Sequence, residues 1–116
     1  MAINLESELA LHAQALDLRV ERTKVLAANI ANAETPGYQA RDLDFKAELA
    51  RLEHGGDLSA GYQMMFRIPA QLSADRNTVE LDQEQARFAQ NGMDFETSIT
   101  FLNMKLGGIK SALTGE

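Results

Sequence analysis

The sequence predicts a mainly α-helical fold in which two long terminal helices pack as a coiled-coil-like hairpin. Apolar residues recur at alternating spacings of four and three near both ends of the chain, and a Pro-Gly turn follows the first series. A short middle segment, whose alternating apolar residues indicate a small β-hairpin-like element, would join the helices. We expect a single elongated domain over 1–116, with an N-terminal helix at 3–32, a middle segment at 33–82 and a C-terminal helix at 83–113.

The N-terminal helix carries two apolar stripes. The first stripe has the spacing of a coiled-coil seam and includes Leu9, Leu16, Val20 and Ile30. The second stripe lies roughly 160–260° away around the axis, at about 100° per residue, and comprises Leu11, Leu18 and Val25. Burial inside an ordinary domain would explain two apolar faces, but 116 residues offer little chain to surround the helix. We favour one face that packs within the chain and one that meets neighbouring copies.

The N-terminal helix is expected to stop at a defined point. Asn29 and Asn32 weaken helical structure, and Pro36 disfavours helical geometry at Thr35. Pro36 followed by Gly37 suits a type II turn, because proline fixes φ at the first central position and glycine permits a positive φ at the second. The chain would therefore change direction just before Tyr38.

The middle segment contains three predicted pieces. Asp42 or Asp44 could cap a short helix over 45–52, and a Gly-rich, polar stretch at 53–61 has the composition of a linker. Residues 62–68 alternate between apolar and polar side chains and predict a strand, for which 78–81 is the expected partner. Together the two strands would make the β-hairpin-like element.

The C-terminal helix has the most regular pattern of the chain. Asp82 is a suitable N-cap, with Gln85 completing a capping-box-like pattern. The predicted seam comprises Phe88, Phe95, Ile99, Leu102, Leu106 and Ile109. The opposite face carries Met93, Phe101 and Met104. These three residues, together with the second stripe of the N-terminal helix, form the predicted assembly face.

Composition excludes several classes of protein. The net charge of −6, with basic residues scattered along the chain, argues against binding to a nucleic-acid backbone. The absence of cysteine excludes disulfides and thiolate metal sites. No apolar run approaches the roughly 20 residues of a membrane span, and the N-terminus lacks the pattern of a secretory signal peptide. Without a route that bypasses such a signal, these features indicate a cytoplasmic protein.

No residue pattern points to catalysis. His12 lies one helical turn from Glu8, but a histidine on a helix face is usually structural, and His54 falls in a predicted loop. Asp42 and Asp44, like Glu84 near the start of the second helix, are better explained by capping and solvation than by acid–base chemistry. We expect no enzyme activity, no cofactor, no bound metal and no small-molecule substrate.

Two stretches of the sequence resemble a known family. The segment 25–45, with its Thr-Pro-Gly-Tyr core after Asn29 and Asn32, is similar to the N-terminal signature of bacterial flagellar axial proteins, the rod and hook family. The extension Ala-Arg-Asp-Leu-Asp-Phe at 40–45 is typical of one rod member, and the segments 62–69 and 77–84 resemble its middle region. The stretch 53–61 is shorter than is usual for that family.

The resemblance implies a structural, non-enzymatic subunit of the proximal rod of the flagellar basal body, which transmits torque from the membrane ring to the distal rod. Implied partners are copies of itself, other proximal rod proteins, the rod–ring junction protein, the membrane ring and the flagellar type III export apparatus. Delivery by that apparatus would place the chain in the periplasmic rod without a cleaved signal peptide. A helix hairpin with two binding faces also suits an open helical polymer.

Two other functions remain open at this point. The first is a cytoplasmic chaperone or adaptor whose helical hairpin binds the amphipathic helix of another protein. The second is a small hydrolase that uses Asp42 and Glu84.

Overall fold

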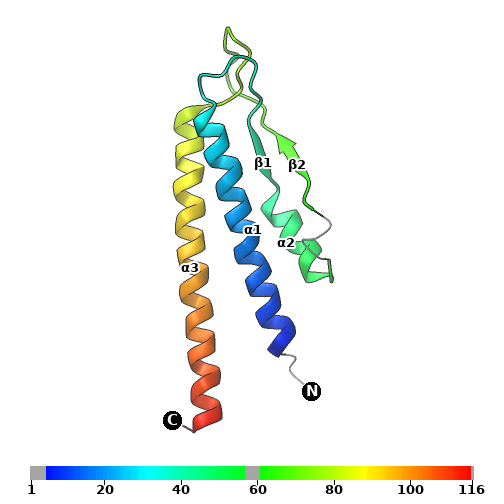
Figure 1. The fold of residues 1–116 in the computed structure, drawn as a ribbon, viewed down its shortest axis with the longest axis vertical. Coiled ribbons are helices and arrows are strands. Elements are labelled where there is room, and N and C mark those ends of the chain that lie inside the picture. Colours follow the sequence, from blue (N-terminus) through cyan, green and yellow to red (C-terminus); the bar gives the residue numbers. More distant parts are fainter. Residues whose placement is uncertain (1–4, 57–60, 116) are drawn as a thin grey trace.

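A computed structural model describes residues 5–56 and 61–115 of the chain. The elements in chain order are α1 (Leu5–Ala31), β1 (Arg41–Leu43), α2 (Phe45–Glu53), β2 (Met64–Phe66) and α3 (Leu81–Thr114). The molecule is elongated, with extents of 64 × 27 × 19 Å. Helices α1 and α3 lie side by side and run in opposite directions, while α2 and the two strands lie along another side of α1 (Figure 1). The predicted mainly α-helical hairpin with a small β element in its middle is confirmed.

The contact between α1 and α3 is polar along much of its length. Asn91 is fully buried, and its side-chain amide donates to the carbonyl oxygen of Arg19 (3.1 Å) and to Thr23 Oγ1 (2.7 Å). Near the other end of the hairpin, Lys105 Nζ lies 2.8 Å from a carboxylate oxygen of Glu8. Hydrogen bonds and an ion pair therefore contribute to a contact that the sequence pattern predicted to be apolar.

The predicted seam is shifted from the centre of this contact. Val20, Phe88 and Leu106 keep 40%, 40% and 43% of their surface exposed, so the prediction that they fill the seam is wrong. The remaining seam residues are half-buried: Leu9, Leu16, Ile30, Phe95, Ile99, Leu102 and Ile109. The two helices are rotated so that Asn91 and the fully buried Glu84 face α1, because both side chains find hydrogen-bond partners there.

The second stripe of α1 forms the core of the protein instead of an assembly face. Leu18 is fully buried against Leu43 of β1 and Leu52 of α2, and Leu11 packs against the same cluster. Val25 is half-buried. The prediction that these α1 residues meet other subunits is therefore wrong for Leu18 and Leu11, since the middle segment folds back along α1 and covers them (Figure 1).

The short helix α2 forms where the sequence predicted it. The side chain of Asp44 accepts a hydrogen bond from the backbone N–H of Ala47 (3.2 Å) and caps the helix, so of the two candidate caps Asp44 is the one used. The guanidinium of Arg19 lies 4.0 Å from the ring centroid of Phe45, at the start of the helix. Part of the linker predicted at 53–61 lies outside the described residues.

The strand pairing differs from the predicted one. β2 pairs antiparallel with β1, with Arg41 opposite Phe66 and Leu43 opposite Met64. The predicted partner at 78–81 is not a strand: Thr78 N–H donates to the carbonyl oxygen of Tyr38 (3.0 Å), and Leu81 already begins α3. The N-cap position of α3 is Glu80, without a side-chain cap, so the prediction of Asp82 is wrong by two residues.

Truncation of the core leucine tests this arrangement. We expect Leu18→Ala to lower the free energy of unfolding by about 2–5 kcal/mol, because it leaves a cavity between α1, β1 and α2. Met93→Ala on the exposed side of α3 should change it by no more than about 0.5 kcal/mol. Urea unfolding followed by far-ultraviolet circular dichroism measures both values. Similar small losses for the two variants would show that Leu18 is not in the core.

Candidate functional site

The turn after α1 has the predicted type II geometry. The N–H of Tyr38 donates to the carbonyl oxygen of Thr35 (3.2 Å), and Gly37 has a φ of +73°. A residue with a side chain would be strained at this φ, although space is open around the position. Asn32 supports the turn from the helix end, since its amide donates to the carbonyl oxygen of Ala28 (2.8 Å) and its oxygen accepts from Thr35 Oγ1 (3.0 Å).

Asn77, which is far from this turn in the sequence, also holds the turn through hydrogen bonds. Its side-chain amide lies within hydrogen-bond distance of three carbonyl oxygens, those of Asn32 (2.9 Å), Ala33 (3.0 Å) and Thr35 (2.8 Å). The N–H of Gly37 also donates to the carbonyl oxygen of Asp75 (2.8 Å). The sequence analysis missed this role of Asn77, because an asparagine in a turn-forming stretch gives no sign of a partner 42–45 residues away.

Asn29 joins the end of α1 to β1 and α3. Its amide donates to the carbonyl oxygen of Arg41 (2.6 Å) and its oxygen accepts from the N–H of Arg41 (3.0 Å), so the side chain pairs with β1 as a neighbouring strand would. The same amide donates to Glu84 Oε2 (3.0 Å), and the Tyr38 hydroxyl approaches its oxygen at 3.4 Å. Asn29 is fully buried, which makes these partners a requirement of the fold.

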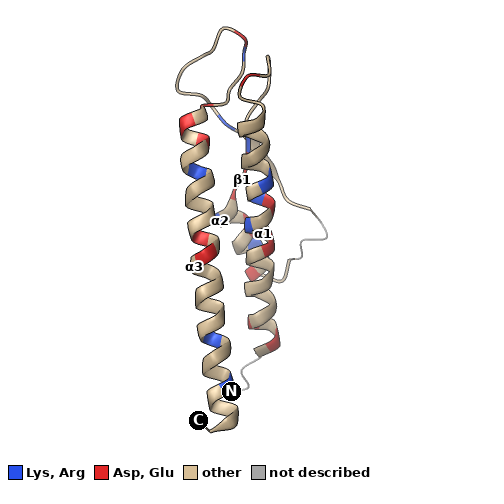
Figure 2. Cartoon of the chain, turned by 60° about the vertical axis from the view of Figure 1, so that its left-hand side comes forward, with Lys and Arg blue, Asp and Glu red and all other residues tan. Residues whose placement is uncertain are grey.

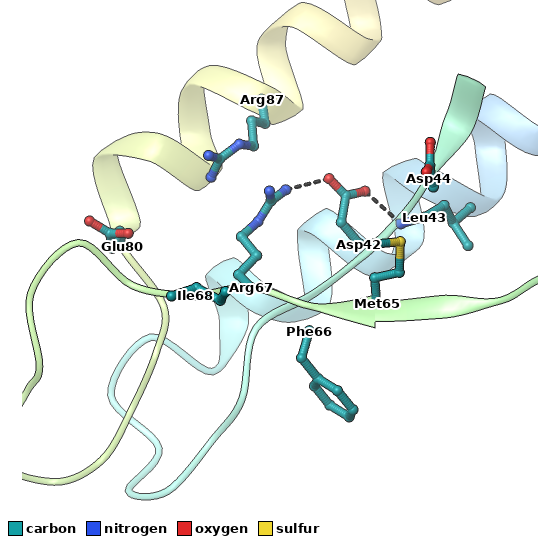
Figure 3. Close-up of a pocket in the computed structure, with 9 residues that line it drawn as sticks. All are labelled: Asp42, Leu43, Asp44, Met65, Phe66, Arg67, Ile68, Glu80 and Arg87. Carbon is teal, nitrogen blue, oxygen red and sulfur yellow. Dashed lines mark hydrogen bonds and ion pairs between the residues drawn. The ribbon is translucent and has the colours of Figure 1, made fainter. Parts of the chain in front are cut away.

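A buried ion-pair network lies next to Asn29. Arg22 forms a two-point contact with Asp42 (Nε to Oδ1 2.9 Å, Nη2 to Oδ2 3.0 Å). Arg67, just beyond β2, pairs with both Asp42 and Glu84, with its Nε 2.7 Å from Glu84 Oε1. Figure 3 shows the Arg67 side chain directed at Asp42, while Phe66 points away. We call the set Arg22, Asn29, Asp42, Arg67 and Glu84 the clamp.

The clamp keeps Asp42 ionised. Burial alone would raise the pKa of this carboxyl, but the hydrogen bonds from Arg22 and the charges of Arg22 and Arg67 outweigh burial and hold the pKa below its ordinary value. The contact with Asp42 in turn raises the pKa of Arg22. Both carboxylates that could have served a hydrolase are thus engaged by arginines, which is a structural arrangement.

The other chemical candidates have structural surroundings. The ring of His12 lies 5.8 Å from that of Phe101, and His54 Nδ1 lies 2.7 Å from the carbonyl oxygen of Ala50. No cluster of three or more potential metal ligands occurs within 5–56 or 61–115. An open cavity of about 270 Å³ borders the clamp between β2 and α3, and Arg87 lines it with its Nη1 3.6 Å from Glu84 Oε1 (Figure 3).

Two apolar surfaces remain uncovered. Met93, Phe101 and Met104 on α3 are 65%, 55% and 71% exposed, as residues available for contacts with other chains would be. The sequence analysis did not predict the second surface, which comprises Phe66, Ile68 and Leu72 at the end of β2 and in the loop that follows. Neither long helix, nor α2, combines the length and the apolar character needed to cross a membrane within the described part of the chain.

Comparison with known proteins gives consistent matches. A family model described as flagella basal body rod protein matches residues 9–39, which include α1 from Leu9 onward and the turn. The flagellar basal body rod protein FlgB of Cereibacter sphaeroides is 43% identical, over 94% of this chain and 95% of its own length. The FlgB proteins of Salmonella typhimurium and Escherichia coli are 38% and 37% identical, over 99% and 97% of both chains. The Salmonella alignment runs over 136 positions, so that relative has residues this chain lacks.

Acid should weaken the clamp through Asp42. Because its folded pKa is lowered, Asp42 contributes its full stabilisation above the unfolded pKa of about 4, and this contribution is lost as the pH falls through the folded value. We expect the free energy of unfolding to fall as the pH drops below about 5 and through the lowered folded pKa, and to fall less steeply in Asp42→Asn. Urea titrations across this range test the expectation. Parallel curves for the two proteins would contradict an ion-paired Asp42.

Proposed function

The chain belongs to the FlgB family of flagellar basal body rod proteins, and from this premise we propose that it is a subunit of the proximal rod. Its role in the flagellar basal body is structural, as the family name states. In our proposal the subunit polymerises with copies of itself and with other proximal rod proteins. The assembled rod would connect the membrane ring to the distal rod, transmit torque and be required for motility.

The observation that carries this proposal is the similarity to FlgB proteins over nearly the whole chain. The structure adds two supporting features. The chain is long and narrow, and α3 exposes an apolar face along its length, whereas the clamp joins α1 to α3 at one end of the hairpin. A subunit of this shape can lie beside others in a tube, with a rigid end set by the clamp and a helix face available for neighbours.

Further partners follow from the same premise. We infer contacts with the rod–ring junction protein and the membrane ring, and delivery by the flagellar type III export apparatus to the periplasmic rod without a cleaved signal peptide. The exposed face of α3 would equally suit a cytoplasmic adaptor that binds an amphipathic helix, and this second candidate is the alternative that the experiment must separate.

Deletion of the gene in its host tests the proposal. We expect no swarming, and electron microscopy of detergent-extracted basal bodies should show membrane rings without a rod. The intact gene should restore both. Met104→Asp should fail to restore them, because it places a charge on the exposed apolar face of α3. Ala10→Asp, an exposed position on α1, is the matched control and should restore both.

Equal helix content in the two purified variants would show that the change at Met104 affects assembly and not folding. Normal rods and normal swarming in the deletion strain would contradict a rod subunit. A soluble one-to-one complex with a single client protein, together with absence from purified basal bodies, would support the adaptor.

A further inference from the structure

The hairpin covers its most regular apolar pattern only in part. Polar side chains such as Asn91 hold α1 against α3, while Val20, Phe88 and Leu106 stay about two-fifths exposed. Leu16 and Val20 each lie two residues from the buried Leu18, which places them about 200° around the helix from it. They therefore face away from the middle segment, which covers Leu18.

The exposed and half-buried seam residues come from both helices, and a cavity joins the two helices near the middle of this set. We define the open face as Leu9, Leu16, Val20, Phe88, Gly92, Phe95, Ile99 and Leu106. A cavity of about 290 Å³ at its centre is lined by residues of α1 and α3, among them Val20, Gly92 and Phe95. A side chain placed at Gly92 would meet no atom within 4 Å, so there is room above this position for a side chain of another chain.

A second surface lies on the far side of α3. We define the outer stripe as Ala86, Gln90, Met93, Thr97, Thr100, Met104, Gly107 and Ser111, all of which are exposed. Met93 follows Asn91 by two residues and so points about 200° away from the contact with α1. The stripe has the same four-three spacing as the open face and contains no charged residue.

We propose that the outer stripe of one copy packs into the open face of a second copy, an inference that rests on the proposed rod function. The outer stripe has the same helical period as the open face, which runs over 88–106 on α3, roughly 27 Å at 1.5 Å per residue, and helix packing of the coiled-coil type requires such a match. The methionines of the stripe are flexible enough to fill the cavity beside Gly92.

Charge identifies α3, and not α1, as the helix that docks. The part of α1 that remains exposed carries Glu6, Asp17 and Lys24, whose burial against an apolar surface would be costly. The charged residues of α3 beyond Ala86 all lie outside the outer stripe: Arg87, Asp94, Glu96, Lys105 and Lys110. Figure 2 shows α3 as mostly uncharged toward its C-terminal end, and Lys105 is paired with Glu8 of its own chain. The outer stripe can therefore be buried without the loss of a hydrated charge.

The contact would join two different surfaces. Each copy would use its open face for one neighbour and its outer stripe for another, so the arrangement propagates and does not close into a dimer. This geometry differs from the predicted assembly face, because the α1 contribution comes from the half-exposed seam and not from Leu11 or Leu18.

Single and mixed variants test this pairing in the purified chain. We expect the wild type to form species larger than dimers in sedimentation velocity as its concentration rises. Val20→Glu, which blocks the open face, and the double variant Met93→Glu/Met104→Glu, which blocks the outer stripe, should each sediment as a 12.8 kDa monomer. Ala10→Glu, on the charged side of α1, should behave as the wild type. Circular dichroism checks that all four proteins retain their helices.

The mixture gives the decisive result. Val20→Glu keeps an intact outer stripe and the double variant keeps an intact open face, so an equimolar mixture should form a one-to-one dimer that grows no further. Because the chain has no cysteine, Val20→Cys mixed with Met93→Cys or with Met104→Cys should also form a disulfide between copies when dissolved oxygen is supplied as the oxidant. No dimer in the mixture, or a wild type that stays monomeric, would overturn the pairing.

The rod role and this pairing can fail separately. Rings without rods in the deletion strain establish the rod role whatever the purified chain does. If the deletion strain shows rings without rods but the purified wild-type chain does not self-associate, the proposal that a second copy packs on the open face is wrong.

Discussion

The ion pairs of Arg67 hold the protein together where its segments meet. This one guanidinium contacts Asp42 of β1 and Glu84 of α3, and α1 completes both pairs with Arg22 and Asn29. Removal of Asp42 would take away the counter-charge of Arg22, and removal of Glu84 would leave Arg67 with Asp42 as its single remaining carboxylate in the clamp. The positions of both helices and of the sheet therefore depend on the same few atoms.

The clamp also explains why the hairpin leaves an apolar surface open. At one end of the hairpin, the hydrogen bond between Asn29 and Glu84 fixes which sides of α1 and α3 face each other. Farther along α3, the hydrogen bond from Asn91 to Thr23 keeps the same sides in contact. A helix cannot rotate to bury its apolar seam without breaking these buried hydrogen bonds. The protein thus uses polar contacts in its own fold and leaves apolar residues such as Val20 and Phe88 partly exposed.

Local features of the sequence were predictable, and the contacts between distant segments were not. Turn chemistry located the end of α1 and the type II turn, and a capping residue located α2, because both depend on neighbouring residues. Periodicity found both long helices, but it could not tell which stripe of α1 the middle segment would cover, and Leu18 was therefore misplaced. Thr78 was predicted to lie in a strand, but its N–H donates to the carbonyl oxygen of Tyr38 beside the turn. The hydrogen bonds of Asn77 and the contacts of the clamp became visible only in the structure.

In an isolated subunit, we expect the end of the hairpin that contains the clamp to be stable. The opposite ends of α1 and α3 should be less stable until neighbouring subunits pack against them. Amide hydrogen exchange on the purified monomer tests this difference most directly. We expect the strongest protection at Leu26, Leu43 and Asn91, near the clamp, and much faster exchange at 5–9 and 106–114. Uniform protection along both helices to their ends would contradict this expectation, because the hairpin would then be complete without any partner.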